Sequence, residues 1–364
     1  MGSDLRKVHA VYGQSLWLDN LSRTLLHDGV LARYIAEDGI TGVTSNPSIF
    51  QKAIHSSPFY RDGVASRQGG SAERLYEDLV RTDLQMACDL LHPVYEQTGG
   101  DDGWVSWEES PALAMDEAAA VAEAGRLRSI VNRDNLLIKV PATPPGIAAL
   151  RTLTAQGVPV NLTLMFGLGH VRAAFAAYQE GLASWIGSGG DPRRVKSVAS
   201  LFLSRVDTLV DRRLEAAGSE EALALRGKTA VALAKEAYAI YRETFHGPGF
   251  SHLRALGGRP QYLLWASTGT KNPEYSELLY VESLIGPETV NTLPDATLAR
   301  FRDQGHLEST LGAGLAEARE TLERISRLGI DLEGEVAPLL QQEGLDAFSR
   351  SFQEMLVEVE KLRV

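Results

Sequence analysis

The sequence has little of what would tie it to an oxidising compartment, a membrane or a nucleic acid. Its one cysteine, Cys88, cannot form a disulfide within the chain, so a reducing compartment is expected. No apolar run reaches the roughly 18 residues of a membrane-spanning helix, and the first residues lack a signal-peptide core. With 36 Lys and Arg against 47 Asp and Glu, the net charge of −11 gives no general attraction to nucleic acid or anionic lipid. These absences predict a cytoplasmic protein without nucleic-acid or membrane partners.

Signals for a metal or an organic cofactor are also weak. The eight histidines are scattered without the spacing of metal ligands. Gly167-Leu168-Gly169 lies between a predicted strand and a predicted helix, as in a dinucleotide-binding turn, but Arg172 occupies the third glycine position. Cys88 lies in a helical pattern and is expected in the core. The sequence therefore predicts neither a metal nor a cofactor.

What the sequence does contain is a regular alternation of short apolar runs and longer stretches of helical period. The runs are nearly unbroken, which is typical of parallel strands covered on both faces. Eight strand–helix units favour an α/β fold of the (β/α)₈ or TIM-barrel type over a doubly wound sheet. The predicted strands are 15–18, 40–43, 103–107, 136–140, 158–162, 195–203, 262–265 and 288–293. The predicted helices are 71–97, 115–131, 145–156, 169–185, 204–217 and 219–245.

The length of 364 residues fits one barrel of about 250 residues with helical additions. We expect residues 1–364 to form a single barrel domain, with 1–13 as an N-terminal helical segment. After about residue 307, leucine and isoleucine recur at helical spacings, so residues 307–364 are predicted to form helices that pack on the barrel. A homo-oligomer is possible, but the sequence does not fix the oligomeric state.

Polar side chains stand at the carboxyl ends of the predicted strands, where barrel enzymes place their active sites. These side chains are expected to meet at one end of the barrel. In chain order they are Asp19, Asn46, Glu108, Lys139, Asn161, Thr163, Ser200, Arg205, Ser267 and Lys271.

Lys139 is the most informative of these residues. It lies between Ile138 and Val140 in an apolar run, although lysine is rarely buried. Desolvation there favours the neutral amine, which can attack a carbonyl and form a Schiff base. On position alone, a salt-bridged lysine at a strand end explains the pattern equally well.

Asp19 and Glu108 are candidates for moving the protons that imine formation and hydrolysis require. Taken singly, each carboxylate is more often a helix cap or an ion-pair partner. Glu109 follows Glu108 directly and is expected to point to the opposite face, into solvent.

Two segments resemble the signatures of the transaldolase family. Residues 38–48, DGITGVTSNPS, resemble the first signature, and residues 135–150, NLLIKVPATPPGIAAL, resemble the second, with Lys139 in the place of the Schiff-base lysine. The segments VSWE at 105–108, NLTL at 161–164 and SLFLSR at 200–205 follow in the family's order. The resemblance covers about residues 14 to 306.

The resemblance implies a barrel of the class I aldolase type that needs no cofactor and acts in the non-oxidative pentose phosphate pathway. The family transfers a dihydroxyacetone unit from sedoheptulose 7-phosphate or fructose 6-phosphate to glyceraldehyde 3-phosphate or erythrose 4-phosphate. By this resemblance Lys139 forms the imine, and Asp19 takes and returns the proton of the C4 hydroxyl. The other implied roles are water positioning by Glu108 and Thr163, hydroxyl binding by Asn46 and Asn161, and phosphate binding by Ser200 and Arg205.

The chain departs from the family at the predicted seventh strand. Many members carry a phosphate-binding arginine two residues after the serine of that strand, where this chain has Gly269 after Ser267. Lys271 is expected to bind the phosphate instead, as a point charge without the arginine fork. Two alternatives stay open: a Schiff-base aldolase of the fructose-6-phosphate type, and a catalytically silent sugar-phosphate-binding barrel. The presence of Lys139, Asp19 and Glu108 argues against the silent barrel.

Overall fold

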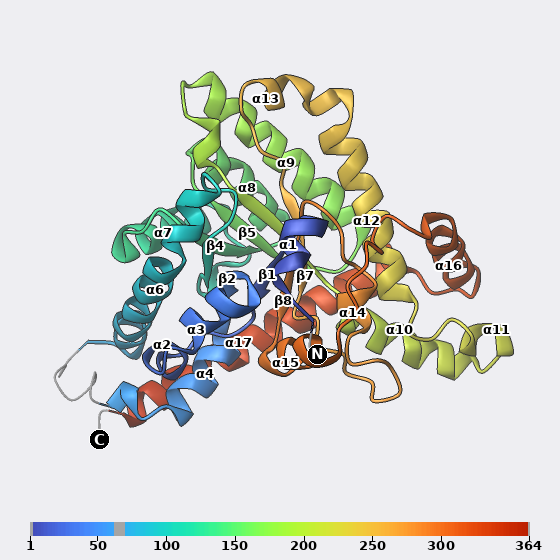
Figure 1. The fold of residues 1–364 in the computed structure, drawn as a ribbon, viewed down its shortest axis with the longest axis horizontal. Helices are drawn as coiled ribbons and strands as arrows, with labels where there is room; N and C mark the ends of the chain where they lie inside the picture. Colours follow the sequence, from blue (N-terminus) through green and yellow to red (C-terminus); the bar gives the residue numbers. More distant parts are fainter. Residues whose placement is uncertain (1–2, 62–69, 363–364) are drawn as a thin grey trace.

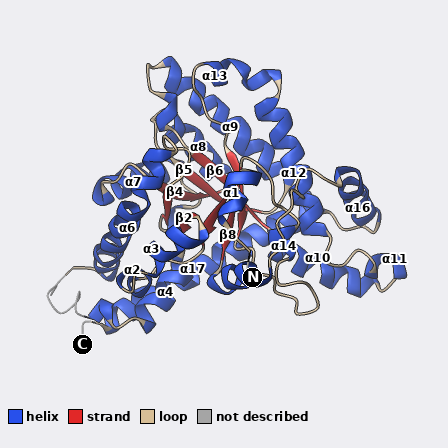
Figure 2. Cartoon of the chain, in the orientation of Figure 1, coloured by secondary structure: helices blue, strands red, loops and turns tan. Residues whose placement is uncertain are grey.

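A computed structural model describes residues 3–61 and 70–362, and in this part of the chain eight parallel strands close into a barrel (Figure 2). Each strand pairs with the next, and β8 pairs with β1. The predicted (β/α)₈ barrel is therefore confirmed. The strands are β1 Gln14–Leu18, β2 Ile40–Thr44, β3 Trp104–Glu108, β4 Leu136–Pro141, β5 Val160–Met165, β6 Ser197–Phe202, β7 Tyr262–Ala266 and β8 Thr289–Leu293.

Helices surround the barrel, and several begin at the signals that the sequence carries (Figure 1). The Ser71 side chain accepts from the N–H of Arg74 at the start of α6, and Thr143 caps α8 in the same way. The longer helices of the barrel are α6 Ala72–Gln97, α7 Glu117–Val131, α8 Pro144–Ala155, α9 Leu168–Gly187, α10 Ser204–Ala217 and α12 Thr229–His246. The shorter ones are α1 Arg6–Tyr12, α2 Arg23–His27, α3 Val30–Arg33, α4 Pro47–Ser56, α11 Glu220–Leu223, α13 Ser251–Ala255, α14 Leu279–Glu282 and α15 Asp295–Gln304. Single turns form η1 Tyr34–Asp38, η2 Pro111–Leu113, η3 Pro192–Arg194 and η4 Pro248–Phe250.

The single helix predicted over residues 219–245 is wrong, because the structure divides it into α11 and α12. Gly227 adopts a left-handed φ of 70°, and its N–H donates to the Asp211 carboxylate at 2.9 Å. The N–H of Ala230, in the first turn of α12, donates to Asp207 at 2.7 Å. Two buried carboxylates of α10 thus bind the backbone at the break, which a helical residue pattern does not reveal.

The interior of the barrel is filled by side chains from alternate positions of its strands. They form a cluster apart from the larger core between the barrel and the helices. The large Trp17 ring in this cluster requires glycine at position 42 of β2, since a Cβ on Gly42 would lie 2.5 Å from the ring. The buried members are Trp17, Trp104, Leu137, Val198, Leu264, Ala266 and Val290.

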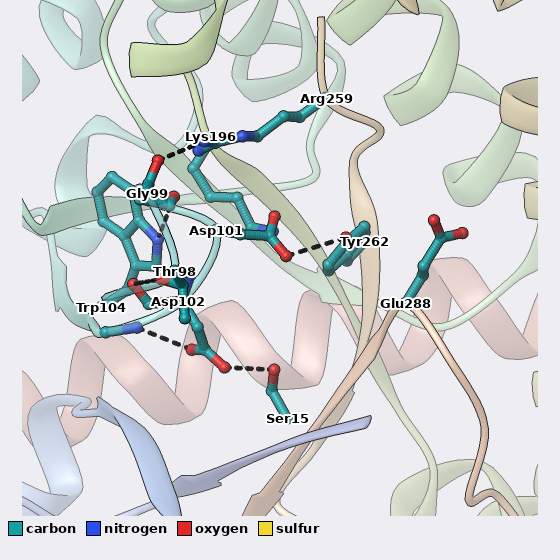
Figure 3. A network of polar contacts seen from close by, with 12 residues as sticks. Ser15, Thr98, Gly99, Asp101, Asp102, Trp104, Lys196, Arg259, Tyr262 and Glu288 are labelled. Carbon is teal, nitrogen blue, oxygen red and sulfur yellow. Dashed lines mark hydrogen bonds and ion pairs between the residues drawn. The ribbon is translucent and has the colours of Figure 1, made fainter. Parts of the chain in front are cut away.

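A polar network closes the amino end of the barrel (Figure 3). Lys196 is buried, lies 2.8 Å from the Asp101 carboxylate, and stands 3.5 Å from the centre of the Tyr262 ring. The buried Asp102 accepts from the hydroxyl of Ser15 and from the indole N–H of Trp17. Lys196 and Asp101 form an ion pair, Asp102 is hydrogen-bonded, and the network lies at the end of the barrel that usually serves stability rather than catalysis.

The chain after β8 and α15 forms two helices and a connecting turn that pack on the outside of the barrel. They are α16 Leu315–Arg327, η5 Leu332–Val336 and α17 Ala337–Lys361. In Figure 1 the red helix α17 passes from the side of α10 to α4, and both helices contact it. Among the described residues, no helix is both long and apolar enough to cross a membrane.

Candidate active site

The ten predicted site residues all lie at the carboxyl end of the barrel. Nine of them line one cavity of about 170 Å³, and the tenth, Glu108, contacts Lys139 beside it. Some lie within strands and others directly after them, because the carboxyl ends of parallel strands share one rim. The nine residues are Asp19, Asn46, Lys139, Asn161, Thr163, Ser200, Arg205, Ser267 and Lys271.

Strand register places three of these residues in one layer. Glu108 of β3 is paired in register with Lys139 of β4, and Lys139 is paired with Asn161 of β5. Residues at the same height of adjacent parallel strands point to the same face, so the carboxylate, the amine and the amide meet inside the barrel. The register therefore explains why residues far apart in sequence form one site.

Lys139 lines the cavity and is nearly buried, with 6% of its surface exposed. Its Nζ donates to the carbonyl oxygen of Ser45 at 3.1 Å and lies 3.8 Å from Glu108 Oε2. The ion pair is longer than a hydrogen bond, so the amine is held without a strong bond to the carboxylate. A buried primary amine that opens into a polar cavity can attack a carbonyl group.

Glu108 is a carboxyl group poised between its two protonation states. Burial raises the pKa of Glu108 to about 7, the charge of Lys139 opposes this rise, and the charge of Asp19 adds to it. Within the described residues, Glu108 Oε2 and the Thr163 hydroxyl are buried and have no hydrogen-bond partner. A carboxyl group with a pKa near neutrality can both donate and accept a proton at physiological pH.

Asp19 and the amide side chains are oriented by neighbouring hydroxyl groups. The Thr44 hydroxyl donates to Asp19 Oδ1 at 2.8 Å, and Ser200 donates to the Asn161 amide oxygen at 2.6 Å. The Asn46 amide oxygen accepts from the first turn of α4, which leaves its NH₂ group for the cavity. These contacts fix the side chains before a substrate binds.

The expectation that Glu109 points into solvent is wrong. Glu109 is 2% exposed, and within the described part of the chain neither carboxyl oxygen has a hydrogen-bond partner. β3 ends at Glu108, so the alternation of faces along a strand does not determine where the next side chain points. Burial, together with the charges of Glu108 and Glu123, raises the pKa of Glu109 to about 8.

The buried Glu109 carboxyl is expected to make stability fall as pH rises. Between pH 4.5 and 8 the unfolded chain ionises this group while the folded chain keeps its proton, so the folded state loses relative stability. Glu109→Gln removes this titration. The unfolding free energy of Glu109→Gln minus that of the wild type should increase by on the order of 3 kcal/mol from pH 5 to pH 8. Urea denaturation at several pH values measures this; Glu323→Gln, at an exposed position, is the control. A pH-independent difference contradicts the prediction.

Besides Lys139, the cavity is lined by two cations, Arg205 and Lys271. Arg205 lies in the first turn of α10, and Lys271 lies in the loop after β7. Among the ion pairs of residues 3–61 and 70–362, none involves Arg205 or Lys271. Two unpaired cations in a chain of net charge −11 favour an anionic ligand group at this position.

The loop that carries Lys271 is tied to the helix that carries Arg205. The hydroxyl of Tyr275 donates to Asp211 at 2.7 Å, and that of Tyr280 donates to the neighbouring Asp207 at 2.8 Å. Ser267 adopts a left-handed φ of 50°, and its N–H donates to the Thr292 hydroxyl at 2.9 Å. The strained serine and the anchored loop hold both ends of the segment in place.

Sequence reasoning missed several residues that line the cavity. Thr44, Ser48 and Ser204 are neighbours of predicted residues, so a wider reading of the same segments would have included them. Thr292 lies in β8, whose polar residues were not considered. Phe348 comes from α17, and no pattern in the sequence indicates that this helix reaches the cavity.

The part of the chain that the structure describes contains no group of three His, Cys, Asp or Glu side chains suited to hold a metal ion. Cys88 is buried and donates weakly to the Asn135 carbonyl, and burial raises its pKa, so it is unsuited to act as a thiolate.

Comparison with known proteins gives a consistent result over the whole barrel. The model of the family described as transaldolase/fructose-6-phosphate aldolase matches residues 16–359. A transaldolase of Thiobacillus denitrificans is 55% identical over 349 residues, covering 95% of this chain and 97% of the relative. A transaldolase of Neisseria gonorrhoeae is 46% identical over 94% of this chain and 96% of its own length. A transaldolase of Mycolicibacterium smegmatis is 45% identical, with 94% and 93% covered.

Proposed function

This chain belongs to the transaldolase/fructose-6-phosphate aldolase family and acts as a transaldolase; we propose that Lys139 carries the transferred unit as an imine. The observation that supports this most is the buried amine of Lys139, which lines the cavity between Glu108 and Asn161 in the strand register. The unit is dihydroxyacetone, taken from a ketose phosphate such as sedoheptulose 7-phosphate or fructose 6-phosphate. The acceptor is glyceraldehyde 3-phosphate or erythrose 4-phosphate.

The proposed reaction begins when the Lys139 amine attacks the ketone of the donor. Glu108 and the Thr163 hydroxyl position the water that leaves and later returns, since Glu108 lies beside Lys139, Thr163 lines the same cavity, and both have unsatisfied polar atoms. Asp19 then accepts the C4 hydroxyl proton, the C3–C4 bond breaks, and its electrons enter an enamine on Lys139, while the aldose phosphate that contains C4 leaves. The acceptor aldehyde is attacked by the enamine, and Asp19 returns the proton to the new hydroxyl.

Substrate recognition is divided between the two ends of the cavity. Asn46 and Asn161 bind the hydroxyls of the dihydroxyacetone unit, close to Lys139. Arg205 and Lys271 bind the phosphate together with the Ser267 hydroxyl and with the Ser200 hydroxyl, which turns from the Asn161 amide oxygen to the phosphate. The family's second arginine is replaced here by Lys271, which contributes charge without a bidentate fork.

Arg205→Ala is expected to lower kcat/KM selectively for phosphorylated substrates. Charge-assisted hydrogen bonds contribute roughly 1.5–3 kcal/mol each, so kcat/KM for fructose 6-phosphate should fall by about ten- to a hundredfold. Dihydroxyacetone as donor lacks a phosphate and should lose much less. Steady-state kinetics with both donors measure the difference. Equal losses with both donors would instead indicate a folding defect or a different role for Arg205.

A coupled assay separates transfer from simple cleavage. With fructose 6-phosphate alone, a transaldolase releases little dihydroxyacetone; erythrose 4-phosphate should raise glyceraldehyde 3-phosphate output at least about tenfold, or roughly 1.4 kcal/mol of barrier. Release at a similar rate without an acceptor would place the chain with the fructose-6-phosphate aldolases of the same family. Binding without turnover would indicate a silent sugar-phosphate-binding barrel.

The place of this reaction in the cell is part of the same proposal. Exchange of three-carbon units between phosphorylated sugars belongs to the non-oxidative pentose phosphate pathway. The single, buried cysteine is compatible with the reducing conditions of the cytoplasm, where the substrates would be met.

A further inference from the structure

Helix α17 lies across the carboxyl end of the barrel (Figure 1). One aromatic side chain of this helix lines the cavity. It contacts β5 and the helices α4 and α10. Asn46 caps the start of α4, and Arg205 lies in the first turn of α10. Phe348 is the α17 side chain that lines the cavity, and it is 7% exposed. The helix therefore contributes a wall to a site otherwise built from the barrel strands and their loops.

Contacts with the strands that carry catalytic residues fix the position of α17. The Gln341 amide donates to the carbonyl of Ala142, just after β4, at 2.9 Å and to that of Leu164 in β5 at 3.2 Å. One turn on, Gly344 permits close contact: a Cβ there would lie 2.9 Å from the Leu164 side chain and 3.4 Å from the Arg205 guanidinium. These contacts align α17 with β4 and β5, which carry Lys139 and Thr163.

A second contact also holds this segment on the barrel. It joins η5, just before α17, to the Gly167-Leu168-Gly169 turn. Glu333 in η5 accepts from the N–H groups of Leu168 and Gly169 at 2.7 and 2.8 Å, at the start of the 20-residue helix α9. A Cβ on Gly167 or Gly169 would approach the Glu333 carboxylate to 2.9 Å. The two glycines thus leave room for the Glu333 carboxylate. Its hydrogen bonds to the start of α9 hold the C-terminal segment on the barrel.

Gln341, Gly344 and Phe348 follow one another at helical spacings of three and four residues and so share one face of α17. The face of α17 that contacts the barrel through Gln341 and Gly344 therefore also presents Phe348 to the cavity. Phe352 lies a turn further on and has similar burial, at 8% exposed, but packs against Tyr76 with ring centres 5.9 Å apart. The two phenylalanines differ in whether they line the cavity.

We propose that Phe348 determines the specificity for transfer over release, by keeping water from the three-carbon unit on Lys139 until an acceptor binds. The inference rests on the proposed imine at Lys139. Most other residues around the cavity carry hydroxyl, amide or charged groups that can bind water, whereas Phe348 adds apolar surface with Phe202, Leu264 and Ala266. An apolar wall excludes water that a polar site would otherwise hold.

The competing reaction consumes one water molecule. A proton from solvent adds to the enamine carbon, which gives the imine of dihydroxyacetone on Lys139. Water then adds to the imine carbon, the carbon–nitrogen bond breaks, and dihydroxyacetone leaves with the lysine amine restored. In the net reaction the enamine and one water give the free amine and dihydroxyacetone. Phe348 opposes both the protonation and the hydrolysis, because each needs water close to Lys139.

Phe348→Ala and Phe352→Ala form a matched pair, since both remove a nearly buried ring from the same helix. The rates of dihydroxyacetone release from fructose 6-phosphate and of transfer to erythrose 4-phosphate are measured for each variant. Phe348→Ala is expected to raise the ratio of release to transfer at least about tenfold, and Phe352→Ala to change it less than about twofold. In D₂O the released dihydroxyacetone should carry one solvent deuterium on carbon.

Phe348→Leu keeps an apolar side chain and is expected to hold the ratio of release to transfer near the wild-type value. This variant keeps the proposal testable if the alanine variant does not fold. An equal rise in Phe352→Ala would show that loosening of α17 is sufficient and would overturn the role of Phe348. So would an unchanged ratio in Phe348→Ala with normal borohydride labelling of Lys139. Absence of labelling in the wild type would refute the proposed imine itself, a result distinguishable from either.

Discussion

Borohydride added together with fructose 6-phosphate is expected to attach a three-carbon unit to Lys139 irreversibly. The donor forms an imine with the amine, cleavage leaves a three-carbon enamine, and reduction of its imine form gives a stable secondary amine. Mass spectrometry of proteolytic peptides should find the added unit on the peptide that contains Lys139. Labelling of a different lysine would contradict the assignment.

Lys139→Met and Lys139→Arg are both expected to abolish labelling and to lower turnover by on the order of 10⁴-fold or more. Methionine removes the charge, and arginine keeps a cation beside Glu108 without supplying an amine that forms an imine. Comparable losses in both variants would show that the nucleophile matters, rather than the ion pair. Substantial turnover by either variant would refute the imine mechanism.

Lys196 is an internal control for this experiment. It is at least as buried as Lys139, but it lies at the amino end of the barrel, ion-paired with Asp101 and stacked on Tyr262 (Figure 3). Burial by itself should therefore not produce labelling. A lysine becomes reactive here because it opens into a cavity that holds the substrate, and Lys196 should stay unmodified.

The sequence was sufficient to predict the barrel and the place of Lys139. Unbroken apolar runs record strands that are buried on both faces, and a lysine inside such a run is conspicuous because burying an unpaired charge is unfavourable. The carboxyl-end rule for barrels then groups the polar residues that follow each strand. These inferences depend on local patterns, which a single sequence displays directly.

Features that depend on tertiary contacts could not be predicted in this way. Glu109 is buried although it directly follows the last residue of β3, and α12 starts late because Asp211 and Asp207 bind the backbone N–H groups of Gly227 and Ala230. Phe348 reaches the cavity because Gln341 and Glu333 fasten its segment to the barrel. None of these features has a local period in the sequence that indicates it, and the last two depend on partners from other elements.

Asp19→Ala is expected to separate imine formation from carbon–carbon cleavage. The amine that forms the imine belongs to Lys139, and Glu108 lies beside it, so both remain in the variant. The base that removes the C4 hydroxyl proton is lost, and general-base catalysis typically contributes 10²–10⁴-fold. We therefore expect cleavage of fructose 6-phosphate to slow by about 10²-fold or more.

The trapped product reports which step is lost. In the wild type, borohydride should trap the three-carbon unit, because cleavage precedes reduction. In Asp19→Ala the uncleaved donor should accumulate on Lys139, so the adduct should contain six carbons and the phosphate. Mass spectrometry of the labelled peptide distinguishes the two adducts directly.

Thr44→Val is a matched control, because it removes the hydroxyl that donates to Asp19 Oδ1 at 2.8 Å and leaves the carboxylate in place. The wild-type adduct should persist in Thr44→Val, with cleavage slowed less than in Asp19→Ala. A three-carbon adduct formed at the wild-type rate by Asp19→Ala would exclude Asp19 as the proton acceptor. If a folded Asp19→Ala variant formed neither adduct, Asp19 would be required for the imine itself, which would contradict its assignment to the cleavage step alone.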